Sequence, residues 1–217
     1  MAKIGVILSG CGVFDGTEIH EAILTMLALE RSGADVFYYA PDAPQMHVVD
    51  HSTGTPSGEQ RNILAESARI SRGNIKPLSE ADAQTLDAVI VPGGFGAAKN
   101  LCTFAVAGAS MEVRLDVARL LESMFAQKKP LGFICIAPVI AAKLFSGAGV
   151  VVTVGAAGQP SEAIEAMGAV HIVKTAGEIH VDEANRIVST PAYMVGQSMS
   201  EIAVGIDLLV AEVLKRA

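Results

Sequence analysis

The stretch "PLGFICIAPV" places Cys135, the residue best suited to covalent chemistry, between an apolar run and a helix start. The run is typical of a buried strand, and Pro138 favours a helix beginning there, because the first helical position needs no N–H donor. Backbone N–H groups at a helix start are unpaired and carry the positive end of the helix dipole, so they stabilise a thiolate. The position predicts a nucleophilic cysteine, and a buried core thiol is the alternative that position alone leaves open.

The residues around this cysteine can supply donors for an oxyanion. A carbonyl attacked by the sulfur develops negative charge on oxygen, and the N–H of Ile136 would face it. A second donor is expected from the turn "VPGGFG", because parallel strands end at one sheet edge and their loops gather there. Gly93 and Gly94 would let the backbone approach a small ligand closely. Lys99 and Asn100 follow this turn and are expected either to reach a substrate oxygen or to cap the next segment.

Three histidines are candidates for metal ligands or pocket residues. His47 and His51 are four residues apart, but their segment is β-rich and no third ligand is evident, so no metal site is expected. His20 is expected either to line the pocket mouth or to be an ordinary helix histidine.

The cysteines and glycines of the first loop point to structure rather than to phosphate binding. "SGCG" lacks both GxGxxG spacing and a following lysine, so a loop that shapes a pocket is expected. Cys11 and Cys102 are expected to be pocket-side or redox-sensitive thiols, or simply structural ones. The three cysteines form no CxxC pair, which predicts reduced thiols and a cytosolic, cytoplasmic location.

Short apolar runs alternate with helical periodicity along the chain, as in an α/β protein with a mainly parallel sheet covered on both faces. The strands are expected within 3–9, 34–41, 86–94, 129–136 and 150–155, with a hairpin over 178–190. The helices are expected at about 18–32, 59–72, 110–127, from 138 onward, and at 198–215.

Length and charge limit the classes of function. The 217 residues, 51% of them hydrophobic, are expected to form a single domain over 1–217. The net charge of −7 and the scattered basic residues argue against nucleic acid and against an anionic membrane as partners. The apolar stretch 131–142 is shorter than the roughly 20 residues that cross a bilayer.

Four separated blocks, in order, carry a resemblance that runs along nearly the whole chain: "GVILSGCGVFDGTEIHEA", "VPGGFGAAKN", "PLGFICIAP" and "STPAYM". The chain resembles the class I glutamine amidotransferase-like superfamily, in its PfpI and protein deglycase branch, and the isoprenoid-biosynthesis members of that branch. The resemblance implies a flavodoxin-like three-layer sandwich and a homodimer. It also implies a nucleophile at Cys135 and, at Glu21, a carboxyl on the first helix that hydrogen-bonds the sulfur.

The activity implied by the resemblance is that of a glyoxalase that needs no glutathione, metal or other cofactor. Cys135 would add to glyoxal or methylglyoxal, Glu21 would act as general acid and base, and water would release glycolate or lactate. Such activity has also been interpreted as protein deglycation. Nothing in the residues suggests recognition of a diphosphate.

Departures from the wider superfamily narrow these expectations. The region "STPAYMVGQ" lacks the late histidine of glutaminases, and Ile136 stands where PfpI-type peptidases have a histidine. Neither glutaminase nor peptidase activity is expected, and neither His171 nor His180 can be assigned as a third catalytic residue. The alternative function is a non-catalytic protein of the same fold that binds a partner or senses oxidation through Cys135.

Overall fold

A seven-stranded sheet forms the centre of the computed structural model, which describes all 217 residues. The strand order is β10-β11-β7-β6-β1-β2-β5, and all neighbours are parallel except the antiparallel pair β10 and β11. The bounds are β1 (Lys3–Ile7), β2 (Asp35–Ala40), β5 (Lys76–Pro77), β6 (Ala88–Val91), β7 (Leu131–Ile134), β10 (His180–Asp182) and β11 (Ile187–Thr190). The mainly parallel sheet and the late hairpin are confirmed.

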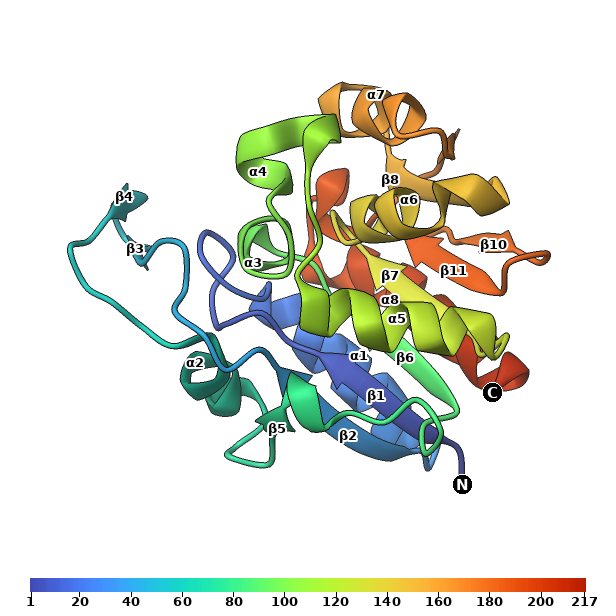
Figure 1. Cartoon of the computed structure of the whole chain (residues 1–217), viewed down its shortest axis with the longest axis horizontal. Helices are drawn as coiled ribbons and strands as arrows, with labels where there is room; N and C mark the ends of the chain where they lie inside the picture. Colours follow the sequence, from blue (N-terminus) through green and yellow to red (C-terminus); the bar gives the residue numbers. More distant parts are fainter.

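Helices cover both faces of this sheet, with α5 and α6 in front of it and α1 and α8 behind it in Figure 1. One face carries α1 (Ile19–Arg31), α2 (Ile63–Ile70) and α8 (Met199–Arg216) over a cluster of 21 buried apolar residues. The other carries α5 (Leu115–Ala126) and α6 (Pro138–Phe145) over a cluster of 30. The short helices α3 (Phe95–Lys99), α4 (Phe104–Ala107) and α7 (Gln159–Ala166) contact this cluster through Ala97, Phe104 and Ile164. The flavodoxin-like three-layer α/β sandwich is therefore confirmed. No helix combines the length and the hydropathy needed to cross a membrane.

Two expected helices are shorter than the sequence pattern suggested. The helix expected at 59–72 is α2. It begins only after Asn62, because the Asn62 side chain caps it and accepts from the N–H of Ala65 at 3.0 Å. The helix expected at 110–127 is α5. It begins only after Arg114, because the backbone of that residue is extended, with φ −55° and ψ 141°. In both cases the backbone at the N-terminal end leaves the helical region.

Two small sheets lie outside the central one. β8 (Val151–Gly155) was expected as a strand, but it pairs in parallel with β9 (Val170–Val173) and not with the main sheet. α7 connects these two strands, and Figure 1 shows this unit above the end of the main sheet. β3 (Val49–Asp50) and β4 (Thr55–Pro56) form the strand-and-turn excursion that follows β2.

The carboxyl ends of three adjacent strands, β7, β6 and β1, open into the loops that build the site. The chain adds β2 on one side of β1 and later adds β6 on the other side. The order in which strands are added therefore reverses between β1 and β6. Ligands of open α/β sheets bind outside the strand ends at such a switch point.

Candidate functional site

Cys135 forms a sharp turn between β7 and α6. Its φ is +63°, in the left-handed region, which costs a residue with a side chain about 1–2 kcal/mol. The turn is held from behind, since the Cys135 N–H donates to the carbonyl of Thr190 on β11 at 2.9 Å. Strained, held backbone of this kind is typical of a nucleophile elbow, which confirms the junction expected from the sequence.

Glu21 reaches the sulfur from the first turn of α1 and is fully buried. Its carboxyl lies beside the Cys135 side chain, since a Cβ on Gly93 would be 2.8 Å from Glu21 Oε2 and 2.4 Å from Cys135 Cβ. The N–H of Gly93 donates to Oε2 at 2.9 Å, and the N–H of Tyr193 approaches Oε1 at 3.4 Å. Backbone N–H groups from two other loops thus hold the Glu21 carboxyl in place beside Cys135.

Burial controls the protonation of this pair. Burial and, after it, the charge of Glu18 raise the pKa of Glu21 to about 8, while the Cys135 side chain and the N–H groups of Gly93 and Tyr193 act in the opposite direction. Burial also raises the pKa of the Cys135 thiol well above its ordinary value, and the Glu21 charge adds to that shift. At neutral pH the pair therefore holds its protons, so the thiolate expected at this helix start is wrong, because burial outweighs the N–H groups. The carboxyl titrates in the range where acid and base catalysts work best.

Two glycines let the backbone pass beside the pair. A Cβ on Gly93 would lie 2.4 Å from Cys135 Cβ and 2.8 Å from Glu21 Oε2. Both distances are too short for non-bonded atoms, so only glycine fits at this position. Gly94 has φ +91°, and a Cβ there would lie 2.3 Å from the nitrogen of Glu18. As a result the N–H groups of Gly94 and Ile136 reach the sulfur and lower its pKa, against the larger effect of burial.

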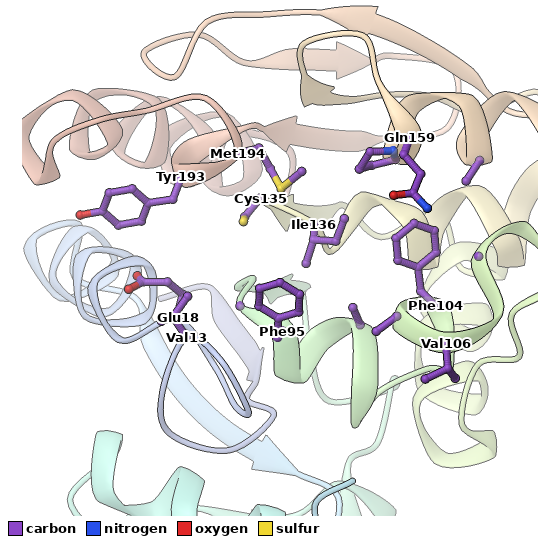
Figure 2. A pocket seen from close by; sticks show the side chains of 16 residues that line it. Val13, Glu18, Phe95, Phe104, Val106, Cys135, Ile136, Gln159, Tyr193 and Met194 are labelled. Atoms are coloured by element: carbon purple, nitrogen blue, oxygen red, sulfur yellow. The ribbon is translucent and has the colours of Figure 1, made fainter. Parts of the chain in front are cut away.

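A cavity of about 490 Å³ opens beside the sulfur (Figure 2). Eleven of its sixteen lining residues are hydrophobic, so it favours a ligand with apolar parts. Glu18 and Tyr193 line one end, and Phe104 and Gln159 lie at the other end, beyond Ile136. Cys135, Gly94 and Ile136 all line it, which brings together the nucleophile and both expected oxyanion donors.

Three residues expected at the site lie beside it or elsewhere. His20 stays at the rim, where its Nδ1 pairs with the Tyr193 hydroxyl at 2.9 Å. Lys99 donates to the carbonyl of Phe14 at 3.1 Å and is outside the lining. Asn100 is buried and bonded to other loops, so the structure does not bring it to Cys135.

Two site residues were not singled out from the sequence. Glu18 caps α1, accepting from the N–H of Glu21 at 2.7 Å, and it is 7% exposed on the cavity wall. The pattern "TEIHEA", with acidic residues three apart at a helix start, was an available signal for this cap. Tyr193 comes from the turn after β11, and only the fold brings that turn to α1.

The other thiols and histidines lie apart from the reactive pair. Cys102 is buried, its Sγ donates to the Ala97 carbonyl at 3.2 Å, and burial raises its pKa to about 12. Cys11 is half-buried and does not line the cavity. His51 pairs with the backbone of Val49 and Phe14. No group of three or more His, Cys, Asp or Glu side chains converges in the way metal ligands would.

Curated relatives match almost the whole chain. A rat protein named ES1 protein homolog, mitochondrial, is 50% identical over 224 residues, covering 99% of this chain and 84% of the relative. A human protein named glutamine amidotransferase-like class 1 domain-containing protein 3, mitochondrial, is also 50% identical, over 99% of this chain and 83% of its own length. No protein-family model matches the chain.

Solved structures agree with the fold. The crystal structure of an isoprenoid biosynthesis protein with an amidotransferase-like domain from Ehrlichia chaffeensis has a TM-score of 0.91 and 34% identity, covering 99% of this chain and 100% of that one. A DJ-1 superfamily protein from Agrobacterium tumefaciens shares the fold, with a TM-score of 0.60 at 16% identity, over 100% of this chain and 92% of that one.

The cytoplasmic location expected from the free thiols is wrong on this comparison, because both curated relatives are named as mitochondrial proteins. All three cysteines are indeed free in the structure. A free thiol indicates reducing surroundings, but it does not separate one reducing compartment from another.

Asn100 ties three loops together, and its loss should destabilise the protein. Its Nδ2 donates to the carbonyls of Ser9 and Asp15, both at 2.8 Å, and its Oδ1 accepts from the N–H of Met46 at 3.0 Å. Asn100→Ala leaves these buried groups unpaired, so we expect the free energy of unfolding to fall by about 3 kcal/mol in denaturant titrations. The exposed control Asn74→Ala should stay within about 0.5 kcal/mol of wild type, and equal effects from the two variants would contradict this role.

The raised pKa of Glu21 makes stability depend on pH. Between its unfolded value of 4.5 and its folded value of about 8, the folded state keeps a proton that the unfolded state releases. This contribution is fully present below pH 4.5 and is lost as pH rises through 8. Wild type should therefore lose up to about 1.4 kcal/mol per pH unit relative to Glu21→Gln, which cannot ionise.

Unfolding midpoints measured from pH 5 to pH 8 check this linkage. The control is Glu30→Gln, on the exposed face of the same helix, which should follow the wild-type curve. Parallel curves for wild type and Glu21→Gln would show that the carboxyl is ionised in the folded protein.

Proposed function

The chain belongs to the family of ES1 and glutamine amidotransferase-like class 1 domain proteins, and from that starting point we propose that it is a cofactor-independent glyoxalase. It converts a 2-oxoaldehyde and water into a 2-hydroxy acid, with Cys135 as nucleophile and Glu21 as general acid and base. The observation that carries the proposal is the fully buried Glu21 carboxyl beside the Cys135 side chain: a Cβ on Gly93 would lie 2.8 Å from Glu21 Oε2 and 2.4 Å from Cys135 Cβ. A structural core thiol has no need of a fully buried, backbone-held carboxyl.

The first step forms a carbon–sulfur bond. The Cys135 sulfur adds to the aldehyde carbon, the carbonyl π bond breaks, and the oxygen takes the proton that leaves the sulfur through Glu21. The N–H groups of Gly94 and Ile136 face the sulfur and would stabilise negative charge developing on that oxygen. The product is a hemithioacetal.

The second step moves hydrogen between neighbouring carbons. The ionised form of Glu21, the minor form at neutral pH because the pKa is raised to about 8, removes the proton from the hemithioacetal carbon and returns one to the adjacent carbon. In the same step the hydroxyl oxygen loses a proton and the adjacent oxygen gains one. One carbon is oxidised as its neighbour is reduced, so the thioester of a 2-hydroxy acid forms without an external oxidant. Water then cleaves the thioester and restores the thiol, releasing glycolate from glyoxal or lactate from methylglyoxal.

The two other functions considered have less support. A redox sensor needs an exposed thiol of low pKa, whereas Cys135 is 7% exposed and burial raises its pKa. Protein deglycation would use the same nucleophile on an aldehyde adduct already attached to a protein. Because the sulfur lies inside a cavity, a free aldehyde is the substrate we propose.

We also propose that the protein is a homodimer that associates through α1. Ile19, Ile23 and Leu27 stand one turn apart on the outer face of this helix, with exposed fractions of 40%, 44% and 38%. A stripe of large apolar side chains at this spacing suits packing against the same stripe of a second copy.

Glycolate formation from glyoxal, without glutathione or added metal, tests the activity. Cys135→Ser should lower turnover about 1,000-fold or more, because a hydroxyl is a far weaker nucleophile at neutral pH. The matched control is Cys11→Ser, which changes a thiol outside the cavity and should retain wild-type turnover. Folding of each variant is checked by circular dichroism. Equal turnover by wild type and folded Cys135→Ser would sink the proposal.

Ile23→Glu tests the dimer by light scattering after size-exclusion chromatography. The substitution places a charge in the middle of the α1 stripe, so we expect wild type to run as a dimer and the variant as a monomer. Leu115→Glu is the control, since Leu115 is 89% exposed on a helix of the opposite face. A monomeric wild type, or a dimer unchanged by Ile23→Glu, would contradict the arrangement.

A further inference from the structure

The cavity beside Cys135 is much larger than the smallest 2-oxoaldehydes require. Its volume is about 490 Å³. Glyoxal has only four heavy atoms and fills on the order of 100 Å³, if each atom takes about the share of one water in the liquid. Cavities of several hundred cubic ångströms normally enclose ligands many times larger. Most of the space is therefore not needed for the reacting carbons.

The two ends of the cavity differ in chemistry. Polar groups gather at the Cys135 end, where Glu18 and Tyr193 lie to one side of Cys135 and the N–H of Gly94 reaches the sulfur. The far end is the apolar arm, formed by α4 and α7 and lined by Phe104, Ala105, Val106, Pro160 and Ala163. Figure 2 shows Phe95 and Ile136 between the two ends, and the Phe104 ring opposite the Gln159 side chain.

This arrangement orients a substituted aldehyde in one direction. The aldehyde carbon must meet the sulfur, and the adjacent carbonyl must stay within reach of Glu21, so both belong at the polar end. The substituent on that second carbonyl is then left to extend past Ile136 into the apolar arm. Hydrogen has nothing to contact there, and a methyl group fills little of it.

We infer that the preferred substrates are 2-oxoaldehydes that carry an aryl or branched alkyl substituent, bound in the apolar arm. This inference rests on the proposed glyoxalase function. The bonds made and broken are those of the two steps already described, so R–CO–CHO and water give R–CH(OH)–COOH. Phenylglyoxal is the simplest aryl member of the class, and its product is mandelate.

Ala163 gives a way to fill the arm without touching the reactive pair. It is 8% exposed, lines the cavity from α7 and has the small side chain that leaves the arm open. Ala163→Leu would place a branched side chain in that space. Ala166→Leu is the matched control, because Ala166 lies on the same helix, is exposed, and is absent from the cavity lining.

The test compares kcat/KM for phenylglyoxal and glyoxal in these variants. For wild type we expect phenylglyoxal to exceed glyoxal about tenfold to a hundredfold, the gain from burying a ring in an apolar pocket. Ala163→Leu should bring the ratio of the two kcat/KM values close to one, and Ala166→Leu should keep the wild-type ratio. Equal kcat/KM for both aldehydes, or a preference that survives Ala163→Leu, would overturn the inference while glyoxal turnover keeps the proposed function.

A second measurement tests binding in the apolar arm without relying on turnover. Acetophenone has the aryl ketone but no aldehyde, so it should slow alkylation of Cys135 by iodoacetamide in wild type and Ala166→Leu, but not in Ala163→Leu. Protection without any turnover would leave the arm assigned as an aryl site and reject the glyoxalase proposal. Glyoxal turnover without protection by acetophenone would reject the arm alone.

Discussion

The contact between the Glu21 carboxyl and the Cys135 sulfur, made where water is excluded, constrains everything around it. The sulfur sits on a residue whose φ of +63° must be held by β11, and the carboxyl is held by the N–H groups of two other loops. Gly93 has no side chain because any Cβ would collide with both members of the pair. Burial then sets the protonation, since it raises the pKa of Glu21 to about 8. A mobile or hydrated version of the pair would have neither this geometry nor this titration.

Part of the site could be predicted from local sequence, and part could not. The apolar run before Cys135 and the proline after it specify a strand, a turn and a helix within a few residues, so the elbow was predictable. Glu21 was identified only through a family resemblance, because a carboxyl flanked by Ile19 and Ile23 gives no local sign of full burial. Those two isoleucines are in fact more exposed than Glu21, which reverses the usual expectation for helix faces.

Lys99 and Asn100 illustrate why closeness in sequence is a weak guide to a site. Both follow the glycine turn that supplies an N–H to the sulfur, and both are turned by the short helix α3 toward the loop after β1.

The walls of the apolar arm pose the opposite problem, because they are far apart in sequence and close in space. α4 and α7 are short, come from separate excursions of the chain, and meet only because the sheet places them at one edge. Nothing in their local composition links them to Cys135.

Because α7 lies between β8 and β9, one wall of the cavity is built on a different sheet from the reactive residues. The reactive residues stand on the main sheet and on α1, where strain and burial leave almost no freedom to change. One wall of the cavity instead belongs to α7, which connects the two strands of a separate small sheet that packs against β10, β11 and α6. Substitutions on the cavity side of α7 would therefore reshape the binding side of the cavity and leave the surroundings of Cys135 and Glu21 unchanged.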